Sequence, residues 1–97
     1  MKIENLISAN GNKVANQFKV ETKNKTYFQS YQSVVAAVYK RSGKVELYQD
    51  WDYSNTKRKY LYRFLRENGH SELCNRKAVL NAIKERKVRV YECNPSL

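Results

Sequence analysis

The chain has 97 residues and a formal net charge of +10, because 19 lysines and arginines oppose nine acidic residues. This length fits a single domain, residues 1–97, with one modest core, and an apolar share of 41% argues against disorder. No apolar run approaches the ~20 residues of a membrane-spanning helix, so we expect a cytoplasmic protein. The basic excess favours an acidic partner: nucleic acid, an acidic protein surface or an anionic membrane.

The first quarter of the chain predicts a hairpin. Residues 3–8 and 13–22 read as strands, and they flank Asn10-Gly11-Asn12, where Gly and Asn tolerate the positive φ of a tight turn. Residues 13–22 alternate between apolar and polar side chains, which is typical of a half-buried strand. Gln17 falls on the polar face of this alternation. A short third strand is expected over 26–29.

A first helix is expected over residues 31–41. Ser30 is a suitable N-cap, and Gly43 is suitably placed after the end of the helix. The apolar residues at helical spacing, expected to form the buried stripe, are Tyr31, Val34, Val35 and Val38. Residues 44–49 alternate again and predict a strand.

The second half of the chain predicts two helices and a last strand. Ser54 or Asp52 would cap a helix over 55–68, and a further helix is expected over 75–86, followed by a strand over 87–92. The expected inward residues are Tyr60, Leu61, Phe64 and Leu65, then Val79, Leu80 and Ile83, then Val88 and Val90. The order strand–strand–(strand)–helix–strand–helix–helix–strand predicts an α+β fold, with a small antiparallel sheet packed against about three helices.

The positive charge is concentrated in the C-terminal part. Residues 54–91 carry eleven bases and three acids, a net +8, and the rest of the chain carries only +2. A tyrosine set among cations at helical spacing suits nucleic acid, since the cations can contact phosphates and the ring can stack. A solvated face is the alternative. The candidate binding residues are Lys57, Arg58, Lys59, Tyr62, Arg63, Arg66, Arg76, Lys77, Lys84, Arg86, Lys87, Arg89 and Tyr91.

Signals for catalysis or metal binding are weak. His70 with Cys74 and Cys93 gives at most three ligands and lacks a Cys-x-x-Cys pair, so we expect no metal site and reduced thiols. Asp50 and Asp52 could hold Mg²⁺ in a small nuclease, but we favour a loop in which Asp52 caps the next helix and Trp51 packs over the core. The loop before the helix over 75–86 is too long for a helix-turn-helix motif. We therefore expect no cofactor and no enzymatic activity.

Three blocks of the sequence, taken together, resemble a group of small, uncharacterised bacteriophage proteins. The blocks are Asn16-Gln17-Phe18, Phe28 to Ala36, and Trp51-Asp52-Tyr53-Ser54-Asn55-Thr56 with Lys59-Tyr60 and Phe64-Leu65 after it. The resemblance covers roughly residues 10–65, and the third block is its most specific part. The richness in Lys, Asn and Tyr is similar to that of phages with AT-rich hosts.

This resemblance implies an origin, and it carries over no functional residues. Small phage proteins without catalytic residues often inhibit host defences, as anti-CRISPR proteins do. The resemblance thus implies a non-enzymatic inhibitor in the host cytoplasm, which binds an RNA-guided effector or its guide RNA through the basic Tyr/Arg surface. A type VI RNA-guided nuclease is one candidate target. The alternative is a phage regulatory protein that binds DNA or RNA directly.

Overall fold

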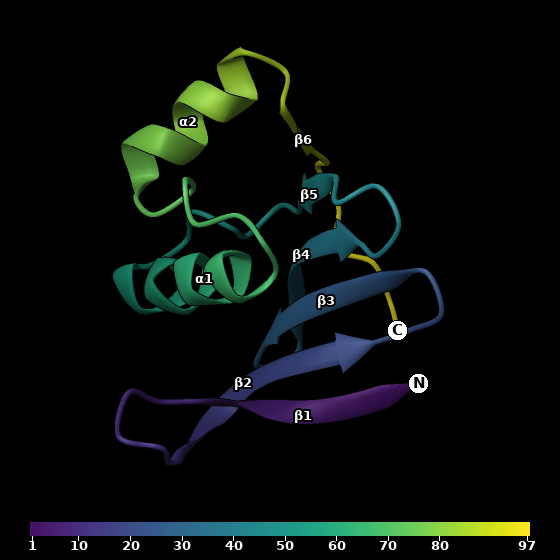
Figure 1. The fold of residues 1–97 in the computed structure, drawn as a ribbon, viewed down its shortest axis with the longest axis vertical. Helices are drawn as coiled ribbons and strands as arrows, with labels where there is room; N and C mark the ends of the chain where they lie inside the picture. Colours follow the sequence, from purple (N-terminus) through teal and green to yellow (C-terminus); the bar gives the residue numbers. More distant parts are fainter.

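A computed structural model describes all 97 residues and contains one sheet and two helices (Figure 1). The strands are β1 (Lys2–Ile7), β2 (Lys13–Glu21), β3 (Lys25–Ser30), β4 (Ser33–Tyr39), β5 (Val45–Leu47) and β6 (Val88–Val90); the helices are α1 (Asn55–Glu67) and α2 (Arg76–Lys84). Strands hold 35% of the residues and helices 23%. Neither helix is long and apolar enough to cross a membrane.

The six strands lie in the order in which they occur in the chain, β1-β2-β3-β4-β5-β6. Neighbours pair antiparallel from β1 to β5, and β6 pairs parallel with β5, with Val45 opposite Val88. The sheet is mixed because the chain leaves β5, forms both helices and returns to the same edge of the sheet. The expectation of a purely antiparallel sheet is therefore wrong.

Both helices cover one face of the sheet (Figure 1). Ser54 caps α1, since its hydroxyl accepts a hydrogen bond from the Lys57 N–H, and Asn75 caps α2, since its side-chain oxygen accepts one from the Ala78 N–H. Beneath α1, Phe64 stacks on Phe28 of β3 with ring centroids 5.7 Å apart. The core of this face is formed by Leu6, Phe28, Val35, Ala36, Val38, Val45, Leu47, Trp51, Leu61, Phe64, Leu65, Leu73, Val79, Ala82 and Val88.

The opposite face of the sheet carries no helix. Tyr27, Tyr48 and Tyr91 pack there over Val34 and Ala37. The C-terminal tail is attached to the same region, because the Asn94 side chain donates to the Val34 carbonyl and the Gln49 N–H donates to the Cys93 carbonyl. The central strands are therefore buried on both faces.

The helix expected over 31–41 is wrong, and so is the prediction of about three helices. Residues 33–39 form the central strand β4, in which every residue from Val34 to Val38 is buried. A strand covered on both faces reads as a continuous apolar run, which periodicity does not distinguish from a buried helix. Ser30 ends β3 rather than capping a helix, and Gly43 (φ +74°) lies in the turn between β4 and β5.

Four individual side chains also depart from the expected pattern. Tyr31, expected in a buried stripe, is 62% exposed in the turn between β3 and β4. Gln17, expected on a solvent face, is only 2% exposed, because it points to the sheet face on which α1 begins. Leu80 of α2 and Val90 of β6, expected to point inward, are exposed, whereas their neighbours Val79, Ala82 and Val88 are buried. Both departures at Tyr31 and Gln17 lie beside the N-terminus of α1.

Candidate nucleic-acid interface

Five of the candidate residues form one continuous surface on α1, here called the α1 surface: Arg58, Lys59, Tyr62, Arg63 and Arg66. The helical repeat brings them together, since positions three and four apart are neighbours on a helix. They line a shallow hollow of about 470 Å³, which Asn55 and Cys74 complete. Lys59 and Arg63 also line a second hollow, beside the turn between β1 and β2.

Asp52 neutralises part of this positive charge. It accepts a 2.8 Å ion pair from Arg58 of α1 and a two-pronged pair, with a shortest distance of 2.9 Å, from Arg76 of α2. The pKa of Asp52 lies below its ordinary value, chiefly because Arg76 donates hydrogen bonds to the carboxylate. The charge of Arg76 and the hydrogen bond and charge of Arg58 lower the pKa further and outweigh partial burial, which raises it. Arg58 also donates to the Asn55 side chain. Arg58 and Arg76 therefore join the two helices.

The other three cations of the α1 surface have no acidic partner. Lys59, Arg63 and Arg66 occur in none of the ion pairs of the protein. They follow one another at i, i+4 and i+7, so they form a single row on the helix. This row is the part of the α1 surface whose charge is available to a ligand.

Tyr62 is less accessible than a free stacking residue. Its ring is half-buried against the core, and its hydroxyl is buried without a hydrogen-bond partner. Burial raises the pKa of this hydroxyl, so it stays protonated at neutral pH. Tyr62 thus lies in the floor of the hollow and does not project from it as a platform for stacking.

The remaining candidates lie outside the α1 surface. Lys77 and Lys84 are exposed on α2, and Lys57 is half-buried with its ammonium 5.1 Å from the Tyr53 ring centroid. Arg86, Lys87, Arg89 and Tyr91 line a separate hollow of about 500 Å³ at the edge formed by β5 and β6, together with Lys44. Nine of the thirteen predicted residues therefore lie on two surfaces that share no residue, and the other four, Lys57, Arg76, Lys77 and Lys84, lie on neither.

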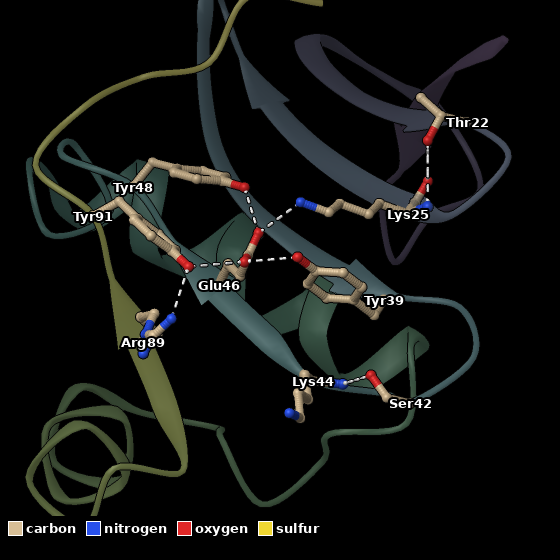
Figure 2. Close-up of polar contacts among 9 residues, drawn as sticks. All are labelled: Thr22, Lys25, Tyr39, Ser42, Lys44, Glu46, Tyr48, Arg89 and Tyr91. Carbon is tan, nitrogen blue, oxygen red and sulfur yellow. Dashed lines mark hydrogen bonds and ion pairs between the residues drawn. The ribbon is translucent and has the colours of Figure 1, made fainter.

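A carboxylate that the sequence patterns did not single out organises this second surface. Glu46 of β5 is 8% exposed and accepts hydrogen bonds from four side chains (Figure 2). Its Oε1 atom is 3.0 Å from Lys25 Nζ and 2.8 Å from the Tyr48 hydroxyl, and its Oε2 atom is 3.0 Å from the Tyr39 hydroxyl and 3.2 Å from the Tyr91 hydroxyl. These five residues are here called the Glu46 cluster.

The charges and hydroxyl groups of the Glu46 cluster pair with one another. Burial favours the neutral acid, but the hydrogen bonds from Lys25, Tyr48 and Tyr39 outweigh it and hold the pKa of Glu46 below its ordinary value. Burial and the bond to the ionised carboxylate raise the pKa of Tyr48. Tyr91 stacks on Tyr48 with centroids 5.9 Å apart, and Arg89 points at the Tyr91 hydroxyl from the rim (Figure 2). Tyr91 is consequently held by the fold itself.

The weak catalytic and metal signals do not converge on a site. No group of three or more His, Cys, Asp or Glu side chains is arranged to hold a metal ion. Asp52 is occupied by two arginines, and His70 links the α1–α2 loop to the Gly43 carbonyl, 2.6 Å away, and to Glu72. Cys74 and Cys93 are both exposed free thiols.

The patterns missed three residues near the start of α1: Gln17, Tyr31 and Tyr53. Tyr53 is 80% exposed and Tyr31 62% exposed, whereas Gln17 is buried with its side-chain Oε1 atom unpartnered. Tyr53 lies in the loop that precedes α1, where an exposed aromatic residue could have been noticed. No sequence signal marks Gln17, since its burial depends on where α1 packs.

The comparisons with known proteins identify a family. A family model described as "Family of unknown function (DUF8033)" matches residues 1–81. Curated proteins gave no match, and neither did solved structures. The matched range includes the α1 surface and most of the Glu46 cluster, and it excludes β6 with Arg86, Lys87, Arg89 and Tyr91. Because the match covers most of the sequence, the chain belongs to this family of unknown function, DUF8033.

Proposed function

We propose that the protein binds nucleic acid through the α1 surface and does not alter it chemically. The observation that carries this proposal is the row of Lys59, Arg63 and Arg66, three neighbouring cations without an acidic partner. Cations in such a row repel one another by a few tenths of a kcal/mol per pair, a cost that a line of phosphates removes. Asp52, the acidic side chain beside Arg58, is already paired with two arginines, and Glu67 at the end of α1 forms no ion pair with the row.

Phosphates fit this surface better than an acidic protein does. The α1 surface is a shallow hollow that contains guanidinium groups, and guanidinium matches the paired oxygens of a phosphate. Interfaces between proteins usually centre on a desolvated apolar or aromatic core. Here the central aromatic residue, Tyr62, is half-buried beneath the cations.

The test is a binding titration with fluorescently labelled RNA and DNA strands at several salt concentrations. Neutralisation of about three phosphates on a single strand predicts a slope near −2 for the logarithm of the binding constant against that of salt concentration. The double variant Arg63→Glu with Arg66→Glu should lose binding while keeping its circular dichroism spectrum. No shift of any probe at ~50 mM salt would refute the proposal.

A matched control separates this local effect from net charge. Lys23 and Lys40 are exposed and lie in turns of the sheet, outside the hollows of both surfaces. Lys23→Glu with Lys40→Glu changes the net charge by the same amount as the α1 variant. Equal loss of binding in the two double variants would mean that only the overall charge matters.

A second candidate function is inhibition of a host-defence effector, as the sequence resemblance implies. It is favoured by the division of the cations into two surfaces, because one protein with two contact surfaces could hold a guide RNA and its effector together. Affinity purification with and without nuclease treatment tests it. A protein partner that survives nuclease supports the inhibitor, and one that disappears was bridged by nucleic acid.

A further inference from the structure

A third hollow, of about 250 Å³, lies where the N-terminus of α1 meets the turn between β3 and β4. Its walls include the exposed rings of Tyr31 and Tyr53, and Lys57 lies at its rim. Gln17 and Ser30, each 2% exposed, form its floor. No acidic side chain lines it. Its volume is below the ~300–1,000 Å³ of pockets that enclose a drug-sized ligand, and it suits a single planar ring system.

The floor carries an unsatisfied hydrogen-bonding group. The Gln17 Oε1 atom is buried and has no partner in the protein. Such atoms are uncommon in native proteins, because burying an acceptor away from water costs free energy unless a donor forms a hydrogen bond with it. A carboxamide also offers donors, and this combination matches the mixed donor and acceptor edge of a nucleobase.

Both aromatic walls can stack with a planar ring, and the backbone of one of them, Tyr31, is held in place. Tyr31 has φ +57°, an unusual value for a bulky side chain, and its neighbour across the hairpin, Asn16, has φ +64°. The Tyr31 N–H donates to the Asn16 carbonyl at 2.6 Å, and the Gln29 side chain donates to the Tyr31 carbonyl at 2.8 Å. Backbone strain of this kind persists where the surroundings impose it, often at ligand sites.

The end of α1 adds an anion-binding element. The N–H groups of Asn55 and Thr56 in the first turn have no partner in the chain, and the first turn contains no acidic residue. The positive end of the helix and Lys57 therefore lie at the mouth of the hollow, which no acidic side chain lines. A hydrogen-bonding aromatic ring with a phosphate attached could stack on the tyrosines, donate to Gln17 and place its phosphate at the helix end at the same time.

We propose that this hollow binds one unpaired nucleobase of a single-stranded nucleic acid. The base stacks with Tyr31 and Tyr53, an N–H of its edge donates to Gln17 Oε1, and its phosphate lies at Lys57 and the first turn of α1. The proposal rests on nucleic-acid binding by the α1 surface, since the strand continues from Thr56 at the hollow to Lys59, its neighbour one turn along the helix, and on to Arg63. It adds that binding selects single strands and requires a base.

Fluorescence anisotropy with the full-length protein tests the role of the base. The probes are a 12-nucleotide single strand, the same strand with abasic sites, and the corresponding duplex. Stacking and edge contacts of one base predict roughly 5- to 150-fold weaker binding of the abasic strand. Tyr53→Ala should lose a similar factor with the intact strand, and Tyr53→Phe should bind more tightly than Tyr53→Ala. Because Tyr53 is 80% exposed, its removal leaves the fold intact, which thermal unfolding verifies.

A second readout is independent of the α1 surface. In an NMR titration, adenosine monophosphate should shift the Gln17 side-chain amide resonances, whereas ribose 5-phosphate should shift only the backbone amides of the first turn of α1. Equal binding of intact and abasic strands, or an unmoved Gln17 amide, overturns the base site while leaving nucleic-acid binding intact. Shifts at Gln17 and Tyr53 with an acidic peptide but not with the nucleotide would mean a protein partner instead. If no strand binds at low salt, nucleic-acid binding itself fails.

Discussion

Arginines, lysines and tyrosines gather at two places in this protein, on the α1 surface and in the Glu46 cluster with its rim. In the Glu46 cluster, one buried carboxylate ties Lys25 and three tyrosine hydroxyls together, so their polar groups are used within the fold. On the α1 surface, Asp52 binds two arginines and leaves the row from Lys59 to Arg66 unpaired. The same residue types thus stabilise one region and remain available for binding in the other, and the position of a single carboxylate makes the difference.

The largest effect should follow from removing the carboxylate of the Glu46 cluster. Glu46→Ala leaves the Lys25 charge and three hydroxyls without an acceptor, and we expect it to lower the free energy of unfolding by about 3 kcal/mol. Urea denaturation measures this change. Glu92→Ala, at an exposed glutamate without a hydrogen bond, is the matched control and should stay within ~0.5 kcal/mol of the parent. Equal values for the two variants would mean that the cluster does not stabilise the fold.

Acid should weaken the Glu46 cluster before it affects the row on α1. The pKa of Glu46 in the folded protein lies below its ordinary value of 4.5. Its stabilising contribution is therefore complete above pH 4.5 and is lost as the pH falls through the lower, folded-state pKa. Thermal unfolding between about pH 6 and pH 3 should show a shallower loss of stability for Glu46→Gln than for the parent. Parallel curves would contradict the depressed pKa.

The smallest of these effects should come from Asp52 and should tighten binding. Asp52→Asn frees Arg58 and Arg76 and removes a negative charge beside the α1 surface, so we expect nucleic acid to bind roughly two- to fivefold more tightly. Stability should fall less than in Glu46→Ala, because the pairs of Asp52 are partly exposed. A titration with labelled single strands measures the affinity. Weaker binding would show that Asp52 holds the arginines in their binding geometry.

The parts of the fold that follow local rules could be predicted from the sequence. Helix α1 has its cap at Ser54 and its core residues at helical spacing, and the first hairpin follows from Asn10-Gly11-Asn12. Residues 33–39 could not be assigned by the same rules, because the helices bury one side of β4 and the tyrosines and tail bury the other. Tertiary packing, which the sequence does not display, decided that strand.

Of the candidate site, only the charged residues and their spacing on α1 could be predicted from the sequence. The spacing of Lys59, Arg63 and Arg66 on α1 was sufficient to place them in one row. The pairing of Arg58 and Arg76 with Asp52, and the central position of Glu46, join residues 6 to 45 positions apart in the chain. Such pairings depend on the three-dimensional arrangement, as does the burial of Gln17. The number of cations could therefore be counted from the sequence, but which of them remain unpaired and available to a ligand could not be predicted.

The exposed thiol of Cys74 has a practical consequence. It lines the hollow of the α1 surface, whereas the other cysteine, Cys93, lies in the tail on the opposite face of the sheet. With Cys93→Ser, a single maleimide fluorophore can be attached at Cys74, in the hollow that the row of cations also lines. The native sequence thus provides an attachment point from which occupancy of this hollow can be followed optically, in real time and in crude extracts.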